Sequence, residues 1–216
     1  MQLALFDIGH KPDLVSASKT NLPLQINGLQ FVEDFITDIE HKELLNSINK
    51  CVWLSDLKRR VQHYGYKYDY RKRSLDYSMY LGEIPQWLTL IAKKIVDKGY
   101  MSTLPDQVII NEYRPGQGIA DHIDCEPCFE DTIVSLSLGS TCIMEFKDKI
   151  DRKLKHEVLL KPKSLVVIAG DARYSWTHGI PAREKDKWQN EVLIRATRVS
   201  LTFRKVILID TQKHKH

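Results

Sequence analysis

The chain has 216 residues, a formal net charge of +4, 43% hydrophobic residues and 28% charged residues, which is typical of a soluble globular protein. This length predicts one domain with a sizeable core, and the mild positive charge permits a polyanionic partner without requiring one. The sequence lacks the basic start of a signal peptide and any run near the roughly 20 apolar residues of a membrane span, and its four cysteines are too few for a disulfide framework. We therefore expect a cytoplasmic protein that is not bound to a membrane.

The first fifty residues predict an arm, a short strand and a helix. Residues 1–22 are polar and weakly patterned, so we expect an N-terminal arm laid over the body. Leu29–Val32 is typical of a short strand. Thr37 and, three residues later, Glu40 form a capping box, which predicts the start of a helix. The apolar stripe of that helix includes Ile39, Leu44, Leu45 and Ile48.

A second helix follows a segment of different character. Residues 53–82 have little apolar periodicity and many Tyr, Lys and Arg residues. Pro85 then suits the first turn of a helix, and Gly99 suits its end. The apolar face of this helix would be formed by Trp87, Leu88, Ile91, Ile95 and Val96.

After residue 105 the sequence predicts strands. Short β-branched runs are separated by Gly, Pro, Asp or Lys turns, and residues 138–141 resemble a tight hairpin. Helices followed by about eight strands indicate an α+β fold whose core, residues 105–208, is a sandwich or jelly roll within one domain spanning residues 1–216. The expected strands are Val108–Tyr113, Thr132–Leu138, Thr141–Lys147, Glu157–Leu160, Ser164–Ala169 and Arg198–Leu208.

The stretch Asn111–Asp124 contains a pair of residues that suits a metal. A turn containing Pro115, Gly116 and Gly118 precedes His122 and Asp124. If an extended segment follows the turn, the period of two along a strand places both side chains on one face. An isolated pair of this kind is more often structural, so a third ligand is needed to make the case for a metal.

His178 is the candidate for that third ligand. It follows a predicted strand, and in a jelly roll a late strand can return beside an early one. Two histidines and one carboxylate on one side of a metal, with other positions open, form the facial triad of non-haem Fe(II) oxygenases. The alternative is a partly buried histidine at a turn, because Gly179 and Pro181 follow it.

The segment Arg198–Arg204 has an unusual strand pattern. Val199, Leu201 and Phe203 alternate with Arg198, Ser200, Thr202 and Arg204, so one face of the strand is entirely polar. Two guanidinium groups on that face leave a gap suited to a short dicarboxylate bound at both ends. The alternative is a pair of exposed basic residues that flank a core strand.

Together these motifs resemble the AlkB family of Fe(II)- and 2-oxoglutarate-dependent dioxygenases. The similarity is dense over residues 105–206 and extends to the general layout of residues 25–100. It rests on Asn111-x-Tyr113, Pro115-Gly116, His122-x-Asp124, His178-Gly179-Ile180 and Arg198 followed by Arg204.

The resemblance implies a fold, a cofactor set and residue roles. The expected fold is α+β, a double-stranded β-helix (jelly roll) with N-terminal helices packed on one sheet and a hairpin or loop over the substrate site. Fe(II) would be bound by His122, Asp124 and His178. 2-Oxoglutarate would be held by Asn111, Tyr113, Arg198 and Arg204, with Ser200 as a weaker contact because the family often has Asn there. Oxidation with O₂ needs no general acid or base from the protein, so none is expected.

The basic segment 58–73 is the candidate substrate surface. It contains seven Lys or Arg residues, one acidic residue and tyrosines at positions 64, 66, 68 and 70. On an extended segment these tyrosines would share a face and stack bases beside phosphate-binding arginines. The alternative is an exposed hairpin whose tyrosines pack onto the core; the resemblance favours the substrate role. The expected contacts are Arg59, Arg60, Tyr64, Tyr66, Tyr68 and Arg73.

Three residues near the proposed metal ligands are ambiguous. Glu126 is placed to reach an extruded base. Cys125 and Cys128 form a CxxC pair, which has either a packing role or oxidative sensitivity beside iron, since zinc would need two further nearby ligands. Trp176 is as consistent with the core as with the site.

The resulting hypothesis is a monomeric enzyme that oxidatively removes N-alkyl groups from bases of single-stranded or base-flipped DNA or RNA, as in alkylation repair. A tRNA-modifying hydroxylase of the same family is the close alternative, because PGQGI, HID and RY-x-WTHGI resemble its members. A jelly-roll binding protein without catalysis would leave the triad and both arginines unexplained. A protein or lipid oxygenase would leave the basic tyrosine segment unexplained.

Overall fold

The computed structural model describes residues 25–55, 58–69 and 74–208. The expected N-terminal arm, Tyr70 and Arg73 lie outside these residues. None of the described helices has the length and apolar character needed to cross a bilayer.

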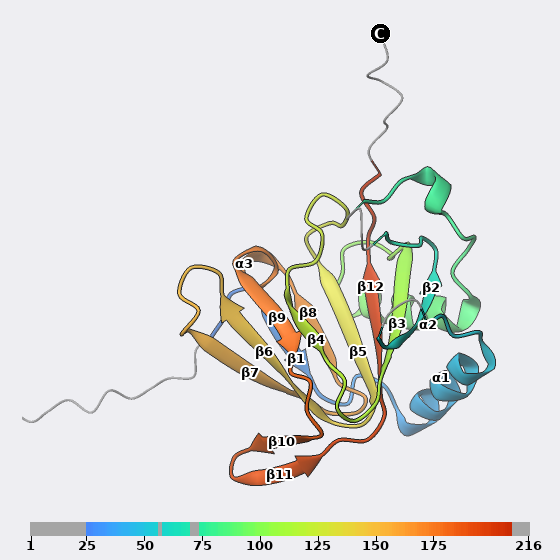
Figure 1. The fold of residues 1–216 in the computed structure, drawn as a ribbon. Coiled ribbons are helices and arrows are strands. Elements are labelled where there is room, and N and C mark those ends of the chain that lie inside the picture. Colours follow the sequence, from blue (N-terminus) through green and yellow to red (C-terminus); the bar gives the residue numbers. More distant parts are fainter. Residues whose placement is uncertain (1–24, 56–57, 70–73, 209–216) are drawn as a thin grey trace, which may run out of the picture.

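Two antiparallel sheets form the body of the molecule (Figure 1). The larger sheet has the strand order β1-β8-β5-β12-β3-β2, and the smaller has the order β4-β9-β6-β7. The six strands of the larger sheet are β1 (Leu29–Val32), β2 (Arg60–Tyr64), β3 (Gln107–Tyr113), β5 (Ile133–Gly139), β8 (Leu165–Ile168) and β12 (Arg198–Arg204). The smaller sheet contains β4 (Ile119–His122), β6 (Cys142–Asp148), β7 (Lys155–Leu160) and β9 (Trp176–Ile180).

Two helices cover the outer face of the six-stranded sheet. α1 (Asp38–Lys50) begins at the predicted capping box, where the Thr37 side chain accepts from Glu40 N and the Glu40 side chain accepts from Thr37 N. α2 (Gln86–Asp97) packs beside it, and residues of both helices share one apolar cluster with β3, β5 and β12. The expectation of N-terminal helices packed on one sheet is therefore confirmed.

The opposite face of the six-stranded sheet meets the four-stranded sheet. A second apolar cluster fills this space, and it includes Phe146, Val166, Ile168 and Trp176. On β12 the alternation expected from the sequence is present, because Val199, Leu201 and Phe203 lie in the helix-side cluster while the polar residues face the other way. The jelly-roll expectation is borne out, and the polar face of β12 lies between the two sheets.

One predicted hairpin is wrong. β5 and β6 are consecutive, but β5 pairs with β8 and β12 whereas β6 pairs with β7 and β9. Gly139 has a φ of 77°, and a Cβ there would lie 2.5 Å from the Thr197 carbonyl oxygen. The glycine therefore turns the chain from one sheet to the other rather than closing a hairpin. The strand predicted to run to Leu208 also ends earlier, at Arg204.

Several elements were not predicted. A short helix, α3 (Gly170–Tyr174), leads directly into β9, and β10 (Lys185–Trp188) pairs with β11 (Glu191–Ile194) in a protruding hairpin (Figure 1). Residues 53–82 contain an edge strand, β2, and a 3₁₀ helix, η1 (Tyr77–Met79). Isolated bridges between Tyr66 and Tyr80 and between Asp69 and Ser74 show that this segment doubles back on itself.

Candidate active site

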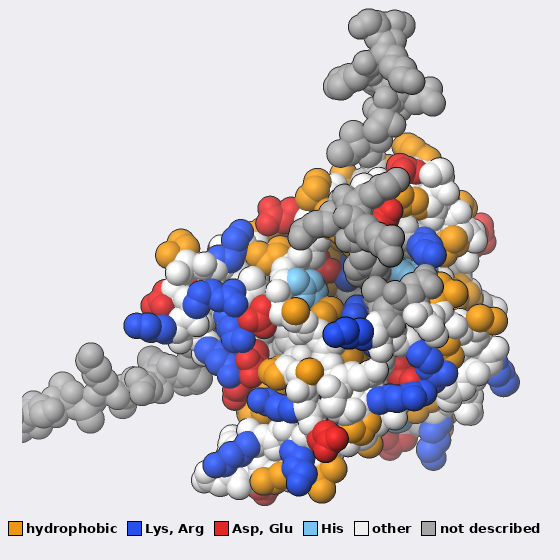
Figure 2. Space-filling view, in the orientation of Figure 1, with side chains coloured by type: hydrophobic (Ala, Val, Ile, Leu, Met, Phe, Trp, Pro, Cys, Tyr) orange, Lys and Arg blue, Asp and Glu red, His pale blue; other side chains and the backbone are white. Residues whose placement is uncertain are grey.

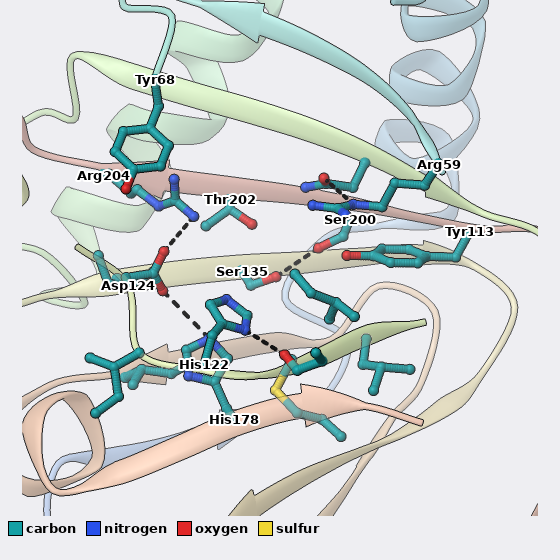
Figure 3. Close-up of a pocket in the computed structure, with 18 of the residues that line it drawn as sticks. Arg59, Tyr68, Tyr113, His122, Asp124, Ser135, His178, Ser200, Thr202 and Arg204 are labelled. Carbon is teal, nitrogen blue, oxygen red and sulfur yellow. Dashed lines mark hydrogen bonds and ion pairs between the residues drawn. The ribbon is translucent and has the colours of Figure 1, made fainter. Parts of the chain in front are cut away.

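Two histidines and one aspartate converge between the sheets. His122 ends β4 and lies opposite His178 of β9 in the strand register, with ring centroids 4.5 Å apart. Asp124 follows β4, and its Oδ2 lies 3.4 Å from His178 Nε2 (Figure 3). One ligand atom from each of the three residues lies within 4.8 Å of the others, which is the spacing that a single metal ion requires.

The close approach of β4 and β9 depends on glycine beside His178. A Cβ on Gly179 would lie 2.5 Å from Asp121 Oδ1 and 3.0 Å from both Asp121 N and Ile119 O. The Asp121 carboxylate could turn away from a Cβ, but the two backbone atoms at 3.0 Å are closer than ordinary van der Waals contact, so a larger residue would push the two strands apart by a few tenths of an ångström. Gly179 therefore sets the separation of the strands that carry both histidines.

The protonation states of the three residues suit a cation. Burial, together with the charge of His178, lowers the pKa of His122 to about 4. Its Nδ1 lies 2.9 Å from the Ala120 carbonyl oxygen, so Nδ1 carries the proton and Nε2 keeps a free lone pair. Burial alone would raise the pKa of Asp124, but the charge of Arg204 and the hydrogen bond from His178 outweigh it and hold that pKa well below its usual range.

A cavity of about 320 Å³ surrounds these residues and continues along the polar face of β12. Figure 3 shows Asp124, Arg204 and Tyr68 toward one end and Arg59, Ser200 and Tyr113 toward the other. The expected cosubstrate residues all line this one cavity: Asn111, Tyr113, Arg198, Ser200 and Arg204.

The arginines in the cavity wall have unused donors. Arg198 Nη2 donates to Ser137 Oγ at 2.8 Å, and Arg204 Nη2 lies 2.5 Å from Asp124 Oδ1. Among the described residues, Arg198 Nε, Arg198 Nη1 and Arg204 Nε are buried without a hydrogen-bond partner. Buried guanidinium donors in a cavity are a site for an anion, so the wall fits a dicarboxylate such as 2-oxoglutarate.

Some of the residues expected to contact substrate line the cavity, and others lie on the helix side of the six-stranded sheet. Arg59 lines the cavity, donates to Asn111 Oδ1 at 2.8 Å and lies over the Tyr113 ring. Tyr68 also lines the cavity and packs against Phe129. Arg60 instead forms an ion pair with Glu112, 2.5 Å from Nη2 to Oε2, on the opposite face of β2.

The expected tyrosine platform is therefore wrong. Tyr64 packs edge-on against Trp87 in the helix-side cluster, whereas Tyr66 pairs with Tyr80 beside the other cluster. Gly65, with a φ of 74°, ends β2 between them and breaks the period of two. Glu126 is half-exposed and lies 4.0 Å from Lys149 Nζ; it does not line the cavity.

Two residues at the site, Ser135 and Arg173, were not predicted. Ser135 lines the cavity and shares a hydrogen bond of 2.9 Å with Ser200, and two serines at alternate positions of an apolar strand were a usable signal. Thr202, which the alternation placed on the polar face of β12, lines the cavity as expected. Arg173 donates to the Asp124 carbonyl oxygen, and nothing in its local sequence pattern indicates that role.

The cysteine pair next to Asp124 forms a disulfide. Cys125 and Cys128 are joined, whereas Cys51 and Cys142 are free. Within the described part of the chain, the only group of three metal-ligating side chains is His122, Asp124 and His178. The zinc reading of the pair therefore finds no support, and Trp176 is a buried core residue.

Comparisons with known proteins place the chain in a family. The family model described as the 2OG-Fe(II) oxygenase superfamily matches residues 36–204. A relative from Acanthamoeba polyphaga mimivirus, "Uncharacterized protein L905", is 39% identical over 88% of this chain and 89% of its own length.

Longer relatives carry names that mention DNA repair or tRNA. The Arabidopsis thaliana "Alkylated DNA repair protein ALKBH8 homolog" is 38% identical over 90% of this chain. The Mus musculus "tRNA (carboxymethyluridine(34)-5-O)-methyltransferase ALKBH8" is 39% identical over 83% of this chain. The chain spans 62% of the length of the first of these and 30% of the second.

A solved structure supports the fold. "The structure of OsALKBH1" matches with a TM-score of 0.64 and 17% identity, and the match covers 85% of this chain and 100% of that one. Taken with the family match and the relatives, the donor set and the anion-binding wall fit Fe(II) and 2-oxoglutarate. The chain belongs to the AlkB family of Fe(II)- and 2-oxoglutarate-dependent oxygenases.

Proposed function

We propose that this protein oxidises a modified base of RNA, with tRNA as the leading substrate class, and that the cavity between its sheets holds Fe(II) and 2-oxoglutarate. His122, Asp124 and His178 would bind the metal on one side and leave its other positions open. The observation that carries the assignment is that Arg198 and Arg204, two buried arginines with three guanidinium N–H groups between them that have no partner among the described residues, line the same cavity as the triad.

The chain's own residues would bind and orient the reactants. Arg198 and Arg204 offer charge-assisted hydrogen bonds to the two carboxylates of 2-oxoglutarate, while Asn111, Tyr113 and Ser200 line the wall between. Arg59 lies across Asn111 and Tyr113 and would close that end against water. With O₂ and 2-oxoglutarate bound, Fe(II) supplies the oxidation of a C–H bond, and the protein supplies binding and orientation.

A nucleic-acid base is the substrate that the relatives favour. The relatives named for tRNA modification or alkylated DNA repair are 38–39% identical to this chain, whereas those named as demethylases, in Danio rerio and Caenorhabditis elegans, are 26% and 24% identical. We place tRNA modification first because the relatives from Mus musculus, Xenopus tropicalis and Macaca fascicularis, at 38–39% identity, are named for tRNA. Repair of N-methyl lesions is the second candidate, because the Arabidopsis thaliana relative at 38% is named for alkylated DNA repair. A base must leave its stack to reach the cavity, and Tyr68 offers an aromatic face there.

The position of the oxidised carbon would separate the two activities. Hydroxylation of a carbon bonded to nitrogen gives a hemiaminal, which breaks down to an aldehyde and the free base. Hydroxylation of a carbon bonded only to carbon leaves a stable hydroxylated base. The first outcome is oxidative demethylation of DNA or RNA, and the second is tRNA modification.

The metal site is tested by replacing its ligands. We expect His122→Ala, Asp124→Ala and His178→Ala each to abolish the conversion of 2-oxoglutarate to succinate while circular dichroism shows a folded protein. His156→Ala is the matched control, because His156 lies on β7 away from the cavity lining and should retain turnover. Undiminished succinate formation in the three ligand variants would refute the metal assignment.

A further inference from the structure

Asp124 is held differently from the two histidines. The ladder between β4 and β9 pairs His122 with His178, and β4 ends there. Asp124 lies beyond the ladder, so strand pairing does not fix its backbone. Its carboxylate contacts Arg204 and His178, but these side-chain contacts leave the position of its main chain to other groups.

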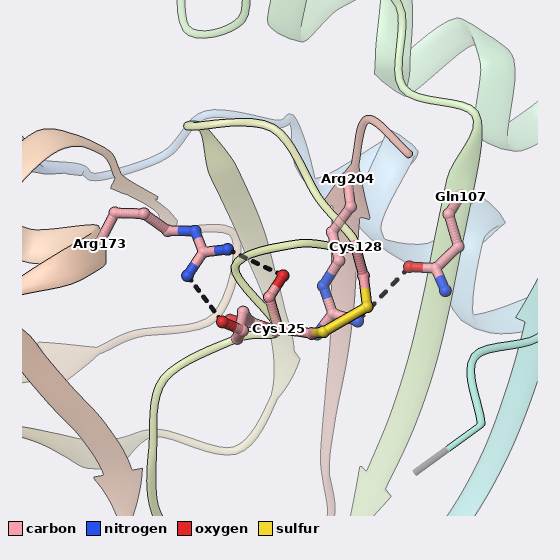
Figure 4. Close-up of a disulfide and its surroundings, with 6 residues drawn as sticks. Gln107, Cys125, Cys128, Arg173 and Arg204 are labelled. Carbon is pink, nitrogen blue, oxygen red and sulfur yellow. Dashed lines mark hydrogen bonds and ion pairs between the residues drawn. A yellow bond between two sulfur atoms is a disulfide. The ribbon is translucent and has the colours of Figure 1, made fainter. Parts of the chain in front are cut away.

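Arg173 supplies a contact to that main chain. Its Nη1 donates to the Asp124 carbonyl oxygen at 2.8 Å, and its Nη2 donates to the Cys125 carbonyl oxygen at 3.3 Å (Figure 4). The planar guanidinium therefore spans two successive peptide groups, which a point charge such as lysine cannot do. Arg173 belongs to α3, which leads directly into the strand that carries His178.

The environment of Arg173 is unfavourable for a charge. Its side chain is only 1% exposed, and it is the largest fully buried side chain of the described residues. Among those residues it forms no salt bridge, and its Nε has no hydrogen-bond partner. A buried guanidinium without a direct ion pair is destabilising unless its contacts compensate. Here those contacts are the two carbonyl oxygens and the ring of Tyr174, whose centroid lies 5.1 Å from Arg173 Cζ.

The turn that Arg173 holds also meets Arg204. Within it, Cys128 N donates to the Cys125 carbonyl oxygen at 3.2 Å and the disulfide joins the two side chains. Ile207 N then donates to the Cys128 carbonyl oxygen at 2.9 Å, which ties the turn to the chain just after β12. The turn is thus fixed on the α3 side by Arg173 and on the β12 side near Arg204.

We infer that Arg173 is a positioning residue for the metal site. Its guanidinium group fixes the peptide groups of Asp124 and Cys125, and this holds the Asp124 carboxylate beside the imidazole rings of His122 and His178. This inference rests on the proposed metal site. It assigns separate tasks to the two buried arginines, since Arg173 holds the backbone of Asp124 and Arg204 contacts its carboxylate.

Metal binding without cosubstrate tests the inference. Metal-free protein is titrated with Co(II) alone, and binding is followed by visible absorption. Arg173→Lys keeps the charge but reaches one carbonyl, and Arg173→Met removes the donors. We expect each variant to bind Co(II) at least about tenfold more weakly, as is usual when a group that orients a ligand is lost. The absorption band at saturation should also change, because Asp124 no longer reaches the metal.

Arg195→Lys is the matched control. Arg195 is also buried, but it pairs with Asp186 at the β10–β11 hairpin, so its loss should lower thermal stability and leave Co(II) affinity unchanged. Unchanged Co(II) affinity in folded Arg173 variants, or an equal loss in Arg195→Lys, would overturn the inference. Failure of both Arg173 variants to fold would also overturn it, because the residue would then serve the fold. If His178→Ala itself retains Co(II) affinity, the metal site is wrong rather than Arg173's role.

Discussion

At the scale of single residues, Gly179 shows how an absent side chain shapes the site. Its Cα faces the backbone of β4, and any Cβ would meet Asp121 and Ile119 at 2.5–3.0 Å. The sequence offers His178-Gly179 as a motif, but only the packing of β4 on β9 explains why the glycine is needed.

Gly179→Ala tests this packing. We expect a lower melting temperature together with weaker Co(II) binding, since separating β4 from β9 also separates His122 from His178. Calorimetry and Co(II) titration on the same samples give both quantities. A variant with the stability and Co(II) affinity of the parent protein would show that the strands adjust without moving the ligands.

His122 links the site to acid stability. Its pKa in the folded protein is about 4, against 6.5 for an unperturbed histidine, so the unfolded state binds more protons between these values. The free energy of unfolding of the metal-free protein should therefore be highest above pH 6.5, as far as His122 contributes, and should fall as the pH is lowered toward 4.

Urea unfolding in the presence of a chelator, from pH 7 to 4, checks this expectation. Burial also lowers the pKa values of His41 and His156, so the comparison must be made with His122→Gln. The variant should lose less stability over this range than the parent protein does. Equal losses in both proteins would contradict the role given to His122.

At the scale of elements, β12 could be predicted from the sequence, whereas β4, β9 and the β10–β11 hairpin could not. On β12, apolar and polar residues alternate strictly over seven positions, and this pattern predicts both the strand and its polar face. β4 and β9 have only four and five residues, too few for a periodic signal. The tyrosine stripe failed because Gly65 reverses the backbone within it, and alternation predicts a shared face only along an unbroken strand.

The β10–β11 hairpin is anchored by a buried carboxylate. Asp186 accepts from Arg195 Nε at 2.6 Å, from Arg195 Nη2 at 2.8 Å and from Arg183 Nε at 2.7 Å. Asp186→Asn would leave Arg195 buried without its counter-charge. We expect the free energy of unfolding to fall by about 3 kcal/mol.

Urea denaturation measures that change. Lys185→Ala and Lys187→Ala are the controls, because both residues are exposed on the same strand and should change stability by no more than about 0.5 kcal/mol. A similarly small change in Asp186→Asn would show that solvent reaches the ion pair.

At the scale of the whole molecule, the two faces of the six-stranded sheet serve different purposes. The helix-side face is apolar and supports the fold, and the face toward the four-stranded sheet carries the cavity. Figure 2 shows histidine atoms in a hollow of the surface, with basic and acidic side chains mixed beside it. Lys147 and Lys155 both pair with Glu145, so these two lysines are not free basic groups.

The fold class and the composition of the cavity were accessible from sequence because each rests on residue types in a fixed order. Ligand spacing and the paired arginines marked the residues that we propose bind the metal and 2-oxoglutarate. The orientation of the expected substrate contacts was less accessible, because the turn at Gly65 interrupts the strand, and Arg60 and Tyr64 proved to face away from the cavity.

Mass spectrometry of RNA treated with the protein tests the central claim most directly. tRNA and methylated DNA and RNA oligomers are incubated with Fe(II), O₂ and 2-oxoglutarate, then digested to nucleosides, with His178→Ala protein in parallel. We expect a nucleoside of tRNA to gain one oxygen atom only with the parent protein and only when 2-oxoglutarate is present. Loss of a methyl group from an oligomer would instead assign demethylation. Nucleosides unchanged in every sample would contradict oxidation of a nucleic-acid base.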